Sequence, residues 1–105
     1  MLNLPENPTL NQFQEYVVEL EKERGFDKQD ILIKCLLLVE EIGELYKAIR
    51  KQAKIAIDPS SKVSDVEQEI ADAFIMLLSV ANRLDINLEK AFLDKEEINK
   101  KRVWK

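Results

Sequence analysis

Two pairs of acidic residues have a spacing that could form a metal site. Glu41 and Glu44 stand three positions apart, and so do Glu69 and Asp72. Residues three apart lie on the same side of an α-helix, so each pair would present two carboxylates together. Apolar residues flank both pairs, in "VEEIGEL" and "EIADAF". An isolated carboxylate in such surroundings is unfavourable, so the pattern calls for a positive partner.

A divalent cation suits these acids better than a basic side chain does. Lys47 is the nearest base to the first pair, and no base follows the second pair before Arg83. Mg²⁺ takes carboxylate oxygens in octahedral geometry, keeps some waters and often contacts substrate phosphates. We therefore expect Mg²⁺, with Mn²⁺ as the alternative. The competing interpretation is that the acids form ordinary solvated helix surfaces.

The composition limits the fold and the chemistry. The 105 residues fit one domain spanning 1–105, and only two glycines and three prolines are present, which favours long helices with few turns. Histidine is absent, which excludes Ser-His-Asp and Cys-His catalysis. Two glycines cannot form a P-loop or a dinucleotide-binding fingerprint. The single cysteine, Cys35, lies in an apolar run, and we expect it to be a small core residue.

The charge and hydropathy patterns limit the partners. The net charge is −4, with both signs interspersed, so we expect no nucleic-acid partner. No apolar run approaches the roughly 20 residues that span a bilayer, and the N-terminus lacks a secretory pattern. We therefore expect a cytoplasmic protein without a membrane partner. A core this small would gain from oligomerisation, so we expect a homodimer or homotetramer.

The apolar periodicity predicts an all-α protein, and short connections favour an antiparallel four-helix bundle. The expected helices cover residues 10–24, 29–53, 64–84 and 88–101. Thr9 is the expected first N-cap, Gly25 the first stop, and Ser64 with Glu67 the capping box of the third helix. Asp27 or Asp30 would cap the second helix. Residues 54–64 are expected to form a loop.

Two helices carry apolar stripes that we expect to face the core. The stripe of the second helix consists of Leu38, Ile42, Leu45 and Ile49. The inward positions of the third helix are expected to be Val66, Ile70, Ala73, Phe74, Leu77 and Ala81. Each acidic pair lies at the edge of its stripe, which would hold the carboxylates against packed side chains.

The two acidic motifs together resemble a known family. "EEIGEL" followed by "EIADAF" is similar to the E-x-x-E … E-x-x-D pattern of the all-α nucleoside triphosphate pyrophosphohydrolases, the MazG-like group. The closing segment "LSVANRLDINLEKAFLDKEEINKKRVW" is also similar, so the resemblance covers about residues 30–105. It implies an oligomeric MazG-like fold in which Glu41, Glu44, Glu69 and Asp72 bind magnesium.

The resemblance implies a hydrolase acting on phosphoric anhydrides. Such enzymes cleave nucleoside triphosphates between the α- and β-phosphates, releasing a monophosphate and pyrophosphate, and so clear unwanted nucleotides. Glu41 or Glu44 would act on the attacking water. Lys95, Asn99 and Arg102, spaced i, i+4, i+7, would share one helix face and bind the substrate's phosphates. The alternative for this face is a solvated basic helix end.

Three questions remain open from the sequence. The substrate could instead be another phosphorylated compound such as phosphoribosyl-ATP, or the chain could be a non-catalytic helical oligomeric adaptor. Glu40 could lie close to the metal or face solvent. The base pocket has several aromatic candidates, each of which fits a core or interface position better than a base-stacking one: Phe13, Tyr16, Phe26 and Trp104.

Overall fold

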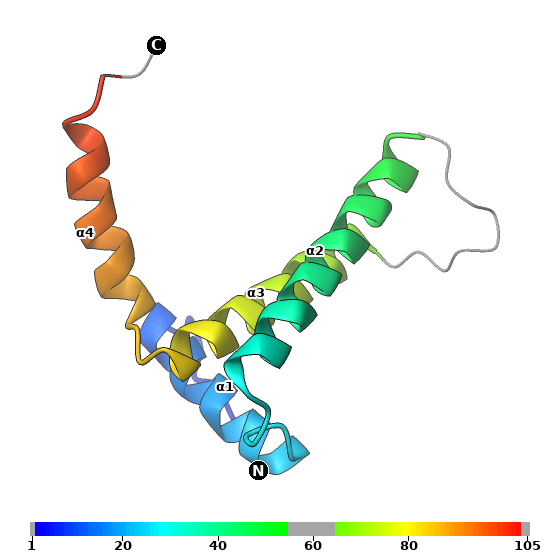
Figure 1. Ribbon diagram of the computed structural model, residues 1–105, viewed down its shortest axis with the longest axis horizontal. Helices are drawn as coiled ribbons and strands as arrows, with labels where there is room; N and C mark the ends of the chain where they lie inside the picture. The colour runs from blue at the N-terminus through cyan, green and yellow to red at the C-terminus, as the bar shows by residue number, and fades with distance from the viewer. Residues whose placement is uncertain (1, 55–64, 104–105) are drawn as a thin grey trace.

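The computed structural model describes residues 2–54 and 65–103, which form four helices and no strand (Figure 1). The helices are α1 (Leu10–Arg24), α2 (Ile31–Gln52), α3 (Val66–Arg83) and α4 (Leu88–Lys100). The all-α prediction is confirmed, and every helix boundary agrees with the expected one to within two residues. The predicted loop, apart from Lys54, lies outside the described residues. None of the described helices combines the length and the apolar composition that a membrane-spanning helix needs.

Short polar residues set the helix ends. The Thr9 hydroxyl accepts a hydrogen bond from the Gln12 backbone N–H, and the Gln12 side chain accepts one from the Thr9 N–H. Gly25 ends α1 in the left-handed region, at φ +76°, where a side chain would be strained. Asp30 caps α2. The N-cap of α3 is Asp65 rather than Ser64, which lies outside the described residues, because an aspartate is an equally good acceptor.

The helices form an open arrangement rather than a closed bundle within one chain. Helices α2 and α3 run antiparallel and pack together, α1 packs against α3, and α4 contacts α1 (Figure 1). Figure 1 shows α4 diverging from the α2–α3 pair. The buried Gln14 of α1 holds the start of α4, because its amide donates to Asn82 Oδ1 and the Ile86 carbonyl and accepts from the Leu88 N–H.

The buried core is small and lies where α1 crosses α3. Its fully buried members are Val17, Leu20 and Leu78. The third-helix prediction holds for Ala81, which is buried, and partly for Val66 and Ala73, which are half-buried. The remaining inward predictions are wrong for a single chain, because these side chains are exposed: Ile70, Phe74 and Leu77.

The side of α2 that faces α3 differs from the predicted stripe. Leu38 and Leu45 are half-buried, but Ile42 is 52% exposed and Ile49 is also exposed. The inward side instead follows Lys34, Glu41 and Ala48, which are seven positions, or about two helical turns, apart. Cys35 lies beside this line and is exposed, so its prediction as a core residue is wrong.

Candidate metal centre

Helices α2 and α3 bring three carboxylates together. Glu41 comes from the middle of α2, and Glu69 and Asp72 come from the first two turns of α3. Each residue offers one carboxylate oxygen, and these three oxygens lie within 4.8 Å of one another. Because α2 and α3 pack side by side, residues far apart in the sequence converge on one point. The structure thus groups three of the four acids predicted to bind metal.

The three carboxylates differ in their exposure to solvent. Glu69 is only 5% exposed, and its Oε2 atom is buried without a hydrogen-bond partner. Glu41 is half-buried and Asp72 is exposed. A buried acceptor without a partner costs free energy, which a cation at this position would recover. Carboxylate oxygens are also the ligands that Mg²⁺ prefers, so the residues present fit this ion.

The electrostatics of Glu41 support the same conclusion. Burial raises the pKa of the Glu41 carboxyl above the ordinary value for a glutamate. The negative charges of Asp72 and Glu69 raise this pKa further, as do a hydrogen bond with the Glu69 side chain and the charge of Glu40. The anionic form of Glu41 is therefore disfavoured until positive charge arrives. A bound cation would supply that charge.

The other two glutamates of α2 lie outside the carboxylate group. Glu44 is half-buried, and its Oε1 lies 3.9 Å from Lys47 Nζ, a partly exposed pair that contributes little to stability. Its metal-binding role remains a prediction. Glu40 is exposed, which matches the solvated alternative.

The predicted phosphate-binding residues lie on a different part of the molecule. Lys95 and Arg102 are exposed on or just beyond α4, and Asn99 is half-buried. Helix α4 diverges from the α2–α3 pair, so a single chain does not bring this basic face to the carboxylates (Figure 1). The substrate-binding role of the three residues therefore remains a prediction.

Of the described aromatic candidates for a base pocket, Phe13 and Tyr16 are packing residues, whereas Phe26 is 43% exposed. Phe13 packs edge-on against Phe74, with ring centroids 5.9 Å apart, and Tyr16 packs against the core. Phe26 lies beneath the Lys34 ammonium, 5.5 Å from the ring centroid. Trp104 lies outside the described residues.

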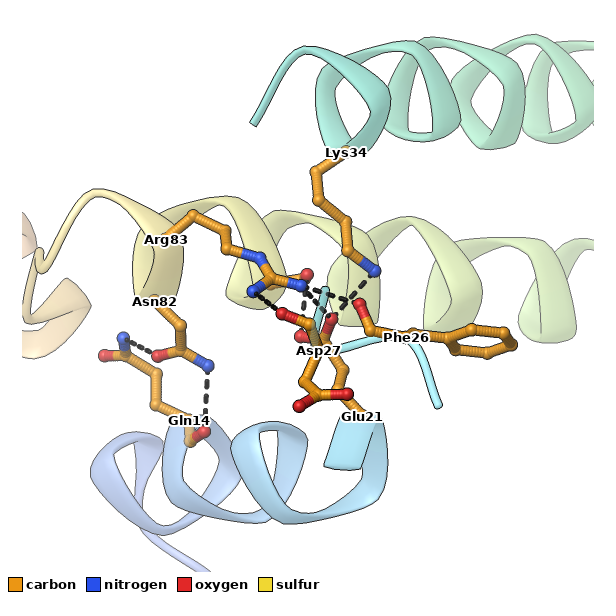
Figure 2. Close-up of polar contacts among 8 residues, drawn as sticks. Gln14, Glu21, Phe26, Asp27, Lys34, Asn82 and Arg83 are labelled. Atoms are coloured by element: carbon orange, nitrogen blue, oxygen red, sulfur yellow. Dashed lines mark hydrogen bonds and ion pairs between the residues drawn. The ribbon is translucent and has the colours of Figure 1, made fainter. Parts of the chain in front are cut away.

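Sequence reasoning missed a buried polar network that joins three helices (Figure 2). Its centre is the Glu21 carboxylate of α1, which pairs with Lys34 of α2 and Arg83 of α3. The Ser79 hydroxyl of α3 donates a third hydrogen bond to this carboxylate. The available signal was the lone lysine in "ILIKCLLL", since a charge within an apolar run needs a buried partner.

Comparisons with known proteins identify a family and related folds for this chain. A model of the MazG nucleotide pyrophosphohydrolase domain matches residues 28–104. Two crystal structures of iMazG from Vibrio DAT 722 are similar, with a TM-score of 0.65, 29% identity and coverage of 88% of this chain and 94% or 98% of theirs. YpjD from Bacillus subtilis, described as a candidate pyrophosphatase, gives a TM-score of 0.72 and 25% identity, over 94% of this chain and 100% of its own.

A comparison with curated protein sequences returned no significant match. The family model nevertheless covers most of the chain, including both acidic motifs. The chain therefore belongs to the MazG family of nucleotide pyrophosphohydrolases, and this membership makes it a hydrolase.

Proposed function

We propose that the protein hydrolyses ribo- or deoxyribonucleoside triphosphates between the α- and β-phosphates, using Mg²⁺, and releases a nucleoside monophosphate and pyrophosphate. Clearance of unwanted nucleotides would be its purpose. Membership of the MazG family supports this reaction class. The observation that carries the proposal is the convergence of Glu41, Glu69 and Asp72 within 4.8 Å, with a buried Glu69 oxygen that lacks a hydrogen-bond partner.

The carboxylates have separate roles in this proposal. Glu41, Glu69 and Asp72 would hold the metal ion, with Glu44 as a fourth ligand or as the base. When bound, Mg²⁺ would offset the negative charge of the phosphate oxygens. Of the two predicted bases, Glu44 fits better than Glu41, because its carboxylate lies outside the group. It would accept a proton from a water whose oxygen bonds to the α-phosphorus, while the bridging oxygen leaves with pyrophosphate.

The substrate's phosphates would bind to the basic face of α4. Lys95 and Arg102 would contribute positive charge, and the Asn99 amide would contribute a hydrogen-bond donor. Because α4 diverges from the carboxylates of its own chain, we propose that oligomerisation brings such a face to each metal site.

The exposed side of α2 supports a homodimer or homotetramer. Leu32 is 72% exposed and Leu36 is 69% exposed, and Val39, Ile42 and Tyr46 continue the same side of the helix. A contiguous apolar helix face left open to water is typical of an interaction surface. A second copy of the chain would bury this face and enlarge the small core.

A nucleotide panel tests the proposed reaction. Each ribo- and deoxyribonucleoside triphosphate, and phosphoribosyl-ATP as a separate sample, is incubated with the protein and Mg²⁺ or with EDTA, and the products are separated by chromatography. We expect monophosphate and pyrophosphate in equal amounts, only with Mg²⁺. Release of inorganic phosphate instead, or activity confined to phosphoribosyl-ATP, would contradict the proposal.

A pair of neighbouring variants tests the metal site. Glu41→Gln should abolish Mg²⁺-dependent pyrophosphate release, because it removes a charge from the carboxylate group. Glu40→Gln is the matched control, since Glu40 is exposed and lies outside the group. It should retain activity. Equal activity in wild type and Glu41→Gln would refute the assignment.

A further inference from the structure

The buried polar network lies on the same helix interface as the candidate metal centre. Lys34 precedes Glu41 on α2 by seven positions, and Ser79 follows Asp72 on α3 by seven. Seven residues make about two turns, so each pair shares one side of its helix, roughly 10 Å apart along the axis. The network and the carboxylates are therefore two layers of the same α2–α3 contact, separated by about two helical turns.

Glu21 of α1 completes this layer with several charge-assisted hydrogen bonds. Its Oε2 lies 2.8 Å from Lys34 Nζ and 3.0 Å from Arg83 Nη2, and its Oε1 accepts from the Ser79 hydroxyl at 2.8 Å. Lys34 and Ser79 are each 1% exposed, and Glu21 is 6% exposed. Figure 2 shows the lysine and the arginine reaching this carboxylate from their two helices.

The network also fixes the connection between α1 and α2. Arg83 Nη1 donates to the Asp27 carbonyl at 2.6 Å, and Nη2 donates to the Phe26 carbonyl at 2.8 Å (Figure 2). This segment leads into α2, which begins at Ile31. Arg83, at the end of α3, therefore holds the segment that precedes α2 by hydrogen bonds.

Such bonds restrict helix position more tightly than the surrounding apolar contacts do. The buried apolar residues of the described chain are few, and apolar contacts have little directionality. They are Val17, Leu20, Ala48, Leu78 and Ala81. Hydrogen bonds between charged groups require defined distances and angles, so they resist rotation and sliding of one helix past another. The Glu21 network contains such bonds from α1, α2 and α3 at once.

We propose that Glu21, Lys34 and Arg83 are positioning residues for the metal centre. By fixing α2 against α3, they hold Glu41 at the correct separation from Glu69 and Asp72, and so determine the affinity for the metal ion. This inference rests on the metal site of the proposed function. It adds a role for residues about two helical turns away, which do not themselves contact the metal ion.

The double variant Glu21→Gln with Lys34→Met tests the role. It replaces the buried ion pair with neutral groups of similar shape, and such replacements often preserve stability. The glutamine oxygen replaces one of the two carboxylate oxygens, so it can accept from Ser79 or from Arg83. Arg83 keeps its hydrogen bonds to the two backbone carbonyls before α2. We expect a helical, cooperatively unfolding protein whose affinity for Mn²⁺, measured by calorimetry without nucleotide and well below its unfolding temperature, is about tenfold weaker.

A second ion pair provides the control. Lys90→Met with Asp94→Asn removes an exposed pair within α4 and should leave the Mn²⁺ affinity unchanged. A folded Glu21→Gln, Lys34→Met variant with wild-type Mn²⁺ affinity would overturn the proposal.

The milder variant Ser79→Ala keeps the test decisive if the double variant does not fold. It removes only the hydroxyl that donates to Glu21, and we expect about threefold weaker Mn²⁺ binding. Unchanged affinity in this variant would also overturn the proposal. Failure of the wild-type protein to bind Mn²⁺ would instead refute the metal site of the proposed function, and the positioning role with it.

Discussion

Replacing Glu69 with glutamine should stabilise the metal-free protein. The substitution keeps the shape of the side chain but removes a negative charge that is 5% exposed and close to Glu41 and Asp72. It also gives the buried end of the side chain an N–H₂ group that can donate to the neighbouring carboxylates. Most substitutions destabilise a protein, so an increase in the free energy of unfolding would run against the usual direction.

The separation of the three carboxylates determines the expected magnitude. Two unit charges 4.8 Å apart repel by about 3 kcal/mol at an effective dielectric constant of about 20. Solvent screens much of this repulsion, because Asp72 is exposed and Glu41 is half-exposed. We therefore expect Glu69→Gln to raise the free energy of unfolding in EDTA by about 1–2 kcal/mol, which corresponds to roughly 5–10 °C in the unfolding temperature.

Thermal unfolding with and without metal is the appropriate assay. Saturating Mg²⁺ should stabilise the wild-type protein by mass action, because the ion binds only the folded state. The Glu69→Gln variant should lose most of this gain, since one carboxylate of the group is missing. The order of stability should therefore reverse: variant above wild type in EDTA, and wild type above variant in Mg²⁺.

A variant less stable than wild type in both conditions would refute this reasoning. That result would mean that the Glu69 carboxylate stabilises the fold through contacts other than a cation. A neutral substitution at an exposed acid, Glu40→Gln, serves as the control and should change stability by less than about 0.5 kcal/mol in either condition.

Further predictions concern pH, assembly and substrate binding. Because the pKa of Glu41 is raised, the folded protein binds this proton more readily than the unfolded chain does. The free energy of unfolding of the metal-free protein should therefore fall as the pH increases above 4.5. Mn²⁺ affinity, measured by calorimetry, should rise over the same pH range. Leu36→Asp should yield a monomer by light scattering with unchanged helical content by circular dichroism, because Leu36 is 69% exposed within one chain. An unaltered oligomer would show that α2 is not the interface. Lys95→Ala should raise the KM for nucleotide about tenfold or more in the pyrophosphate assay, whereas Lys90→Ala, on the other side of α4, should not. An equal change in KM in the two variants would exclude a specific phosphate contact by Lys95.

The sequence was sufficient to predict the helices because their signals are local. Thr9, Gly25 and Asp30 act within one turn of the chain, so cap and stop residues located the helix ends correctly. The pairing of acids three apart is equally local. The sequence therefore predicted Glu41, Glu44, Glu69 and Asp72 as one group, of which the structure brings three together. The resemblance to a family supplied the chemistry that such acids perform.

The orientation of α2 was not predictable in the same way. Its leucines and isoleucines surround more than half of the helix, so periodicity alone did not identify the side that faces α3. The structure places Lys34 and Ala48 on that side and leaves Ile42 and Ile49 exposed. Hydropathy also treats a lysine as a surface residue, whereas its actual environment depends on whether a carboxylate from another helix meets it.

The sequence by itself determined four helices, two acidic motifs and a family resemblance, because each depends on residues within a few positions or on a motif read in order. Only the tertiary structure decided that Glu41 meets Glu69 and Asp72 while Glu44 lies outside the group. It also placed Glu21 at the centre of a buried network and directed α4 away from the carboxylates. These features depend on the rotation and separation of packed helices, which arise from contacts between residues distant in the sequence.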